Sequence, residues 1–295
     1  MAESVQDQWA RWLLHRRHGG DPERQKALLD DLYRVRDEVL KHAGVTQGDV
    51  LLDVGAGDGL IAFGALPLVG EHGRVIFSDI SQNLLDHCQA LADQMRLRER
   101  CTFLRASADD LSALEDAAVD VVTTRSVLIY VPAKQQALRE FYRVLKPGGR
   151  LSIFEPINRF AALTSPFKGW QFDVTPIQAI ADKVRAVYER LQPLETDPMM
   201  NFDERDLLRW TEQAGFSEIH LELRADVAPC RPTQWDVDIR IAGNPTIPTL
   251  EEAMNEALTP AEAEQFTAYM KPRVERGEGT SRLAVAYLWA VKGSG

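Results

Sequence analysis

The stretch VLLDVGAGDG, residues 50–59, decides how the rest of the sequence is interpreted. It begins with an apolar run, and glycines follow directly at positions 55, 57 and 59. Glycine lets the backbone turn sharply and lets N–H groups approach a ligand with no side chain in the way. The stretch therefore predicts a buried strand, a ligand-binding loop and the start of a helix. A nicotinamide-binding loop favours G-x-G-x-x-G, and here Leu60 stands where its last glycine would be.

Strand and helix signals alternate outward from this loop. Helices are expected at 22–42, at 82–95 and after residue 131. Further runs rich in Val, Ile and Leu predict strands at 74–81, 101–111, 119–131 and 149–157. Strands of this kind that alternate with helices indicate a parallel sheet covered on both faces. We therefore expect a doubly wound, Rossmann-like α/β fold.

Two segments with helical signals interrupt the alternation. In the first, we expect a helix that opens at Thr175, with Gln178 in the capping-box position. The second contains the capping boxes Thr249–Glu252 and Thr259–Glu262. Either segment would serve as a lid over a substrate or as surface elaboration. The expected organisation is N-terminal helices or lid, 1–43; core, 44–157; first lid insertion, 158–202; core, 203–224; second lid insertion, 225–279; final core strand, 280–295.

Composition and charge exclude several classes of protein. The chain has 295 residues, 45% of them hydrophobic, which is typical of a globular protein. Its formal net charge of −10 opposes nucleic-acid binding, which normally needs a basic face. No apolar run reaches the roughly 18 residues of a spanning helix, and the first residues are too polar for a secretory signal, so we expect a cytoplasmic protein.

The three cysteines lack C-x-x-C spacing, so we expect reduced thiols and no metal site. The charge does not decide whether the chain forms a homo-oligomer.

Polar residues stand at the ends of the predicted strands. Asp79 ends the second strand, where a carboxylate can accept hydrogen bonds from the hydroxyls of a ribose. Ala108 and Asp109 end the third strand, where a carboxylate can take the amino group of an adenine. Arg125 ends the fourth strand. Because ligands of open α/β sheets bind at the carboxyl ends of the strands, we expect these residues to meet at one site.

Five motifs together resemble the class I S-adenosylmethionine-dependent methyltransferases. They are VLLDVGAGDG, IFSDIS, ASADDL, SVLIYV and LKPGGRLSIFEP, in that family's order and spacing across residues 44–157. The similarity is greatest to the ubiquinone/menaquinone-biosynthesis-like group, which methylates small molecules. The resemblance implies a mostly parallel sheet with an antiparallel last strand. It also implies S-adenosyl-L-methionine as cofactor and S-adenosyl-L-homocysteine as product.

The resemblance assigns the methionine side of the cofactor to the loop and the fourth strand. Gly55, Ala56 and Gly57 would line the methionine and ribose part. Asp53 would order the loop and the amino end. Arg125 would lie near the methionine carboxylate or the sulfonium, although many relatives carry a small or amide residue there.

The resemblance assigns the adenosine side to the ends of the second and third strands. Asp79 would bind the ribose hydroxyls, with Ile80 against the adenine face. Ala108 and Asp109 would hold the adenine edge. A shift of one residue would give the role of Asp109 to Asp110 and leave Asp109 as a surface acid.

Methyl transfer from a sulfonium is an in-line displacement, so the enzyme contributes mainly proximity and alignment. A base is needed only if the acceptor must lose a proton. Tyr130 and Glu155 are the candidate catalytic residues, because each lies near the carboxyl end of a predicted strand. Further candidates for contact with the acceptor are Trp9, Trp12, His15, Tyr33, Asn158, Arg159, Trp170, Phe172 and Asp173.

The sequence favours methyl transfer to a small-molecule acceptor, and aromatic residues in the insertions suggest an apolar or aromatic one. It leaves open whether the acceptor atom is O, N, C or S. One alternative is a non-catalytic protein that binds the cofactor and serves as a partner subunit. Another is a nicotinamide oxidoreductase, against which Leu60 and the LKPGG turn argue.

Overall fold

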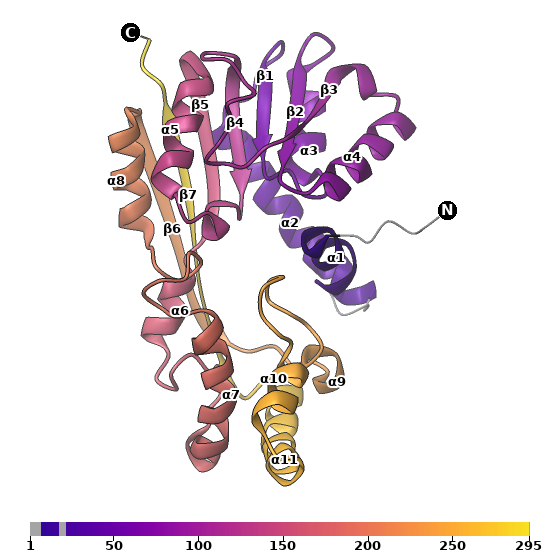
Figure 1. Ribbon diagram of the computed structural model, residues 1–295, viewed down its shortest axis with the longest axis vertical. Helices are drawn as coiled ribbons and strands as arrows, with labels where there is room; N and C mark the ends of the chain where they lie inside the picture. The colour runs from indigo at the N-terminus through magenta and orange to yellow at the C-terminus, as the bar shows by residue number, and fades with distance from the viewer. Residues whose placement is uncertain (1–6, 18–21, 295) are drawn as a thin grey trace.

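The computed structural model describes residues 7–17 and 22–294. A seven-stranded sheet runs through the molecule in the order β3-β2-β1-β4-β5-β7-β6 (Figure 1). The strands are β1 (Val50–Val54), β2 (Arg74–Asp79), β3 (Cys101–Arg105), β4 (Val119–Arg125), β5 (Leu145–Pro156), β6 (Ser217–Pro229) and β7 (Thr280–Val291). Strands β1 to β5 pair in parallel, and β7 is antiparallel to both β5 and β6. The expected doubly wound fold with an antiparallel last strand is confirmed.

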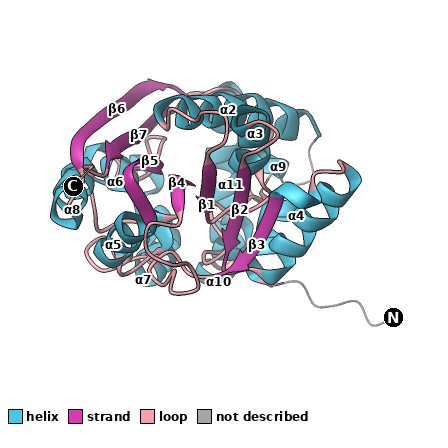
Figure 2. Ribbon diagram, turned by 90° about the horizontal axis from the view of Figure 1, so that it is seen from above, coloured by secondary structure: helices cyan, strands magenta, loops and turns pink. Residues whose placement is uncertain are grey.

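Helices cover both faces of the sheet (Figure 2). One face carries α2 (Pro22–His42), α3 (Leu60–Val69) and α4 (Gln82–Gln94), whose apolar side chains share a core with β1 and β2. The other face carries α5 (Lys134–Val144) and α8 (Glu204–Ala214), packed on β4, β5 and β7. Among the described residues, no helix is long and apolar enough to cross a bilayer.

The two insertions pack together as one helical lobe beyond the carboxyl ends of the parallel strands (Figure 1). It has its own core, in which Val184, Trp235 and Phe266 are buried. Its main elements are α6 (Asn158–Thr164), α7 (Gln178–Leu191), α9 (Trp235–Asp238), α10 (Leu250–Ala257) and α11 (Pro260–Arg276). The position of this lobe makes it a wall of any site at those strand ends.

The capping predictions for the lobe were partly right. Thr249 and Thr259 form capping boxes with Glu252 and Glu262, as expected. The predicted box at Thr175 was wrong, because Thr175–Ile177 forms a 3-10 turn and α7 begins only at Gln178. The Gln178 side chain instead donates a hydrogen bond to Asp182 on the next turn of α7.

Candidate functional site

The loop after β1 is packed tightly against the segment after β4. Gly55 has a φ of +66°, and a Cβ built there would lie 2.2 Å from Cγ2 of Val127. The N–H of Ala56 donates to the carbonyl of Ser78 at 2.9 Å, which fixes the loop beside β2. Only glycine satisfies both the backbone conformation and the space at position 55. The loop therefore presents backbone rather than side chains toward the strand ends.

Asp53, in strand β1 just before the loop, stabilises it from the protein interior. Its carboxylate is buried, accepts a hydrogen bond from the Ala62 N–H at 3.1 Å and accepts another from the Thr123 hydroxyl at 2.9 Å. Burial raises the pKa of Asp53 to about 7, against the effect of these hydrogen bonds. Asp53 thus ties β1 to the first turn of α3 and to β4, and it does not line the cavity described below.

Asp79 links the loop to the end of β2. Its Oδ2 accepts a hydrogen bond from the Gly57 N–H at 2.9 Å, and its Oδ1 accepts one from the Ser81 N–H at 2.8 Å. Burial raises the pKa of this carboxyl group. Each carboxylate oxygen has a further lone pair, and the residue lines the cavity, so Asp79 can accept hydrogen bonds from a ligand.

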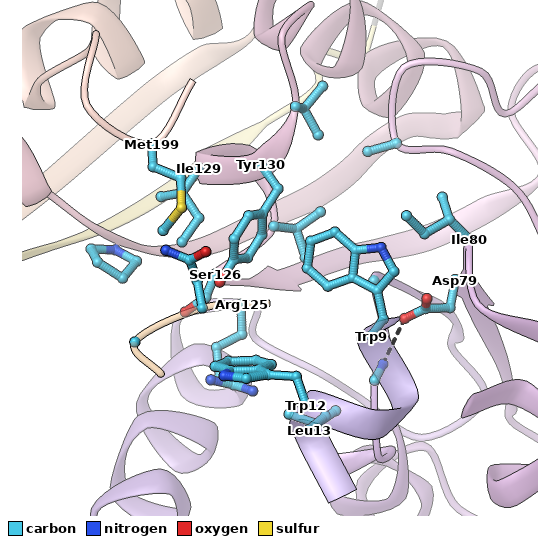
Figure 3. A pocket seen from close by; sticks show the side chains of 18 of the residues that line it. Trp9, Trp12, Leu13, Asp79, Ile80, Arg125, Ser126, Ile129, Tyr130 and Met199 are labelled. Carbon is cyan, nitrogen blue, oxygen red and sulfur yellow. Dashed lines mark hydrogen bonds between the residues drawn. The ribbon is translucent and has the colours of Figure 1, made fainter. Parts of the chain in front are cut away.

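A cavity of about 840 Å³ opens at the carboxyl ends of the parallel strands (Figure 3). It lies where open α/β sheets bind their ligands. Most residues expected at the site line it: Gly55, Gly57, Asp79, Ile80, Ala108, Asp109, Arg125 and Tyr130. Ala56 does not line it, and its side chain is buried in the core beneath the loop. The expected gathering of strand-end residues is therefore found.

The N-terminal segment forms one wall of the cavity. It comprises α1 (Gln8–Arg11) and a π-helical turn over Trp12–Arg16. Trp9 meets the ring of Tyr130 edge-to-face, with 4.8 Å between centroids, and Trp12 Nε1 donates to the carbonyl of Ala242 at 2.9 Å. Asp7 anchors the segment by accepting a hydrogen bond from the Ser81 hydroxyl at 2.6 Å. Figure 3 shows Trp9 beside Tyr130, with Trp12 and Leu13 further along the same segment.

The helical lobe supplies a further wall, which sequence reasoning missed. Met199, Met200, Gln192 and Asn244 line it and come from connecting segments with no periodic pattern. The ammonium of Lys134 fixes the segment that contains Met199, because it donates a hydrogen bond to the carbonyl of Pro198 at 2.7 Å. No sequence signal pointed to these residues, since their place depends on how the lobe packs.

Two guanidinium groups reach the cavity, and sequence reasoning found only one of them. Arg125 was expected, and Arg17 follows the π-helical turn of the N-terminal segment. Among the residues that the structure describes, neither has an acidic side chain within ion-pair distance. Burial, followed by repulsion from Arg125, lowers the pKa of Arg17 to about 10. This end of the cavity is therefore suited to an anionic group.

Glu155 requires a correction, because it does not line the cavity. It is fully buried, and its carboxylate accepts hydrogen bonds from the N–H groups of Val127, Leu128 and Ile129 at 2.8–3.1 Å. These donors belong to the 3-10 turn that carries Tyr130. Burial raises the pKa of Glu155 to about 7. Glu155 positions Tyr130, and it cannot touch an acceptor in this geometry.

The remaining candidates for contact with the acceptor divide by location. Asn158 lines the cavity together with Trp9 and Trp12. The others lie elsewhere. His15 is exposed, Arg159 forms an ion pair with Glu195, and Tyr33 lies in a groove between α2 and α3. The Asp173 carboxylate accepts a hydrogen bond from the Thr175 N–H, and Trp170 and Phe172 pack on the core of the lobe. The N-terminal segment and the strand ends therefore supply more of the cavity lining than the aromatics of the first insertion do.

Solved structures with a similar fold carry different activities. The [4+2]-cyclase SpnF superposes with a TM-score of 0.54 at 21% identity, covering 96% of this chain and 89% of the other. The Haemonchus contortus phosphoethanolamine N-methyltransferase 2, solved with S-adenosylhomocysteine, gives a TM-score of 0.51 at 16% identity, covering 88% and 52%. At these identities the likeness establishes the fold alone.

Sequence comparisons identify the family. An Edwardsiella ictaluri ubiquinone/menaquinone biosynthesis C-methyltransferase is 31% identical over 175 residues, which are 59% of this chain and 68% of that protein. The protein of the same name from Escherichia coli O1:K1 is 30% identical over 185 residues, 60% of this chain and 70% of the other. Residues 29–228 match the ubiE/COQ5 methyltransferase family. The chain belongs to this family and is an S-adenosylmethionine-dependent methyltransferase of small molecules.

Proposed function

We propose that the cavity binds S-adenosylmethionine beside β1 and β2 and holds the methyl acceptor between Tyr130, Met199 and Asn158. The observation that carries this proposal is one continuous cavity in which the Gly55–Gly57 loop and Asp79 form one side and the helical lobe forms the other. Its volume is near the top of the range for ligand sites, about 300–1,000 Å³, as expected where two molecules meet.

The residues that would hold the cofactor fit its chemistry. Asp79 would accept hydrogen bonds from the ribose hydroxyls, Ile80 would lie against the adenine, and Ala108 with Asp109 would hold the adenine edge. Arg125 would face the methionine carboxylate. Support comes from the free lone pairs of Asp79 and from Ile80, which is 46% exposed at the cavity and so has an apolar face available for stacking.

The acceptor would have an apolar body and an anionic substituent. The apolar surface comes from Ile129, Met199 and Ile241. The cofactor has one carboxylate, whereas the cavity has two guanidiniums, neither of which forms an ion pair with an acidic side chain of the described residues. The charge of Arg17 therefore remains for the acceptor. The relatives are C-methyltransferases, which makes carbon the first acceptor atom to test.

The chain would contribute alignment and exclusion of water. The sulfonium supplies an activated methyl group, so this chain's residues need only bring the acceptor atom into line with it. Trp9 and Trp12 close the cavity on the N-terminal side and limit hydration. Burial raises the pKa of Tyr130 to about 12, so its hydroxyl stays protonated near neutral pH and donates a hydrogen bond to the acceptor instead of removing its proton.

Calorimetry with S-adenosylmethionine and S-adenosylhomocysteine tests the cofactor site. We expect micromolar binding that is lost in Asp79→Ala and kept in Asp86→Ala, an exposed acid on α4. Methyl uptake from labelled cofactor is then compared between aromatic carboxylic acids and the corresponding neutral amides. Arg17→Gln should reduce uptake by the acids while leaving S-adenosylhomocysteine affinity unchanged. Folded protein that binds neither compound would refute the proposal, and binding without uptake in any pool would favour the non-catalytic alternative.

A further inference from the structure

Strand β6 leaves one side of the sheet open. It is last in the strand order, and among the strands of the described residues only β7 pairs with it (Figure 2). Most of its side chains are exposed. Proteins usually block such an edge with charged side chains, above all lysine, with proline, with a bulge or by keeping the strand short. The charges of β6 are of both signs, and its irregularity is confined to Ser217–His220. Yet β6 has thirteen residues, no lysine, and a single proline at its last position. From His220 to Pro229 this edge is long enough and regular enough to accept another strand.

The two faces of β6 differ in character. From His220 onward its pairing with β7 is regular, so its side chains alternate between the faces of the sheet. His220 stacks on Trp289, and Arg224 lies over Tyr287, which places the even-numbered residues on the face that carries α2. The odd-numbered residues lie on the face that carries α8 and are apolar, including Leu223, which is 41% exposed.

The sequence of β6 is complementary to itself. In an antiparallel pair of identical strands centred on Leu223, Glu222 faces Arg224 of the partner subunit, and Arg224 faces Glu222. His220 faces the partner's Asp226 in the same way. On the other face Leu223 meets its own copy, and Leu221 meets the partner's Ala225. Opposite charges and apolar pairs directly across two strands stabilise a sheet.

The complementarity depends on the register. A shift of the centre to Glu222 puts glutamate opposite glutamate, and a shift to Arg224 puts arginine opposite arginine. A centre at Ala225 keeps Arg224 opposite Asp226 but leaves Glu222 facing Ala228. Leu223 is also the midpoint of β6, and this centre places the segment from His220 to Asp226, which pairs regularly with β7, opposite its own copy.

We propose that the protein forms a symmetric dimer in which the β6 strands of two copies pair antiparallel about a two-fold axis at Leu223, which joins the two sheets into one. A two-fold interface requires one patch to be complementary to itself, and β6 meets that condition. The proposal does not depend on the methyl acceptor, because β6 does not line the cavity.

Charge reversal tests the pairing. Sedimentation equilibrium of the wild type should give a dimer of about 66 kDa, twice the 33.1 kDa of the chain. Glu222→Arg would break the 2.9 Å ion pair between Glu222 and Arg224 of the same chain. It would also put arginine opposite arginine at two symmetric positions and weaken the dimer by about tenfold or more. Adding Arg224→Glu in the same chain should restore it, because every pair is again opposite. Glu71→Arg makes the same change of charge in an exposed loop and should have no effect.

Cysteine cross-linking tests the register in a way that charge cannot. In a Cys230→Ser background, Leu223→Cys should form an intersubunit disulfide on oxidation, because the residue on the axis lies within bonding range of its own copy. Ala225→Cys should not, because its partner is Leu221. Far-ultraviolet circular dichroism and thermal melting verify that each variant is folded.

Three results would overturn the proposal: a wild type that is monomeric at about 100 μM, a dimer unaffected by Glu222→Arg, or a disulfide that forms with Ala225→Cys and not with Leu223→Cys. Failure of the double charge reversal to restore the dimer would also count against it. A monomeric wild type would leave β6 open to a strand of another protein. A dimer unaffected by Glu222→Arg would place the dimer interface elsewhere.

Discussion

The Asp79 carboxylate accepts a hydrogen bond from the Gly57 N–H at 2.9 Å, and this contact joins the end of β2 to the loop after β1. The same side chain accepts a second hydrogen bond from the Ser81 N–H, at the start of α4. Asp79 thus sets the position of the loop while it lines the cavity. A change at this residue acts both on the shape of the site and on ligand binding.

Asp79→Asn should weaken S-adenosylhomocysteine binding by about 10- to 100-fold. An amide has one acceptor oxygen, so its NH₂ group would meet one of the two backbone donors that Asp79 now satisfies. Titration calorimetry measures the loss, and Asp86→Asn on the exposed side of α4 is the matched control. An unchanged dissociation constant for Asp79→Asn would contradict this role.

Gly55→Ala should destabilise the protein and abolish cofactor binding. The new Cβ would lie 2.2 Å from Val127, whose N–H is held by Glu155. Gly48→Ala is an instructive control, because Gly48 has a φ of +91° but has no atom within 4 Å of its added Cβ. We expect Gly48→Ala to cost about 1 kcal/mol of unfolding free energy, and Gly55→Ala about 1–3 kcal/mol more, by urea denaturation. Equal losses would show that crowding at Gly55 is unimportant.

The buried carboxyl group of Glu155 should make the protein less stable as pH rises. The pKa of Glu155 is about 7 in the folded chain, above the usual 4.5, so the folded state holds this proton more tightly than the unfolded state. Stability is therefore highest below about pH 4.5 for this group and falls as pH rises toward 7, by up to roughly 3 kcal/mol. Asp53 acts in the same direction, because its pKa is also raised to about 7.

Glu155→Gln removes the titration of that residue and should flatten this fall, leaving the part due to Asp53. Urea denaturation at pH 5, 6, 7 and 8 gives the slope for wild type and variant. Asp53→Asn provides the reciprocal measurement on the other buried carboxyl group. A variant slope equal to that of the wild type would mean that Glu155 has an ordinary pKa in the folded chain.

Trp9→Ala should speed the dissociation of S-adenosylhomocysteine about 3- to 10-fold, because the edge-to-face contact with Tyr130 would be lost from the wall of the cavity. Trp9→Phe keeps an aromatic ring at this position and should retain most of the wild-type rate. Stopped-flow displacement with excess unlabelled ligand gives both rates. If the two variants behave alike, the ring contact does not retain the ligand.

The fold was largely predictable from the sequence because the parallel strands are buried on both faces. Val121 and Val122, for example, point to opposite faces of β4 and are both fully buried, so the strand is a continuous apolar run. Strand β6 is different. The core segment expected at 203–224 stops at Arg224, but β6 continues to Pro229, where its side chains are exposed and no buried apolar run marks the strand.

The candidate site was predictable only on the side built from strand ends. Asp79 and Arg125 follow strands, so topology alone brings them together. Met199 and Asn244 enter the cavity from connecting segments of the lobe, where no periodicity fixes their position. Glu155 was expected to contact the acceptor for the same topological reason, but three neighbouring backbone N–H groups bind its carboxylate instead.

The place of β7 between β5 and β6 has a consequence for biosynthesis. A ribosome makes β6 some fifty residues before β7, so β6 has no neighbour to pair with until residues 280–291 have emerged. During that interval the nascent chain exposes the edge of β5, because Leu288 and Tyr287, the later partners of Ile153 and Phe154 in β7, have not yet been made. Late pairing between segments far apart in sequence is slow and leaves such edges open to aggregation. We expect nascent chains of this protein to need chaperone protection until the final strand closes the sheet.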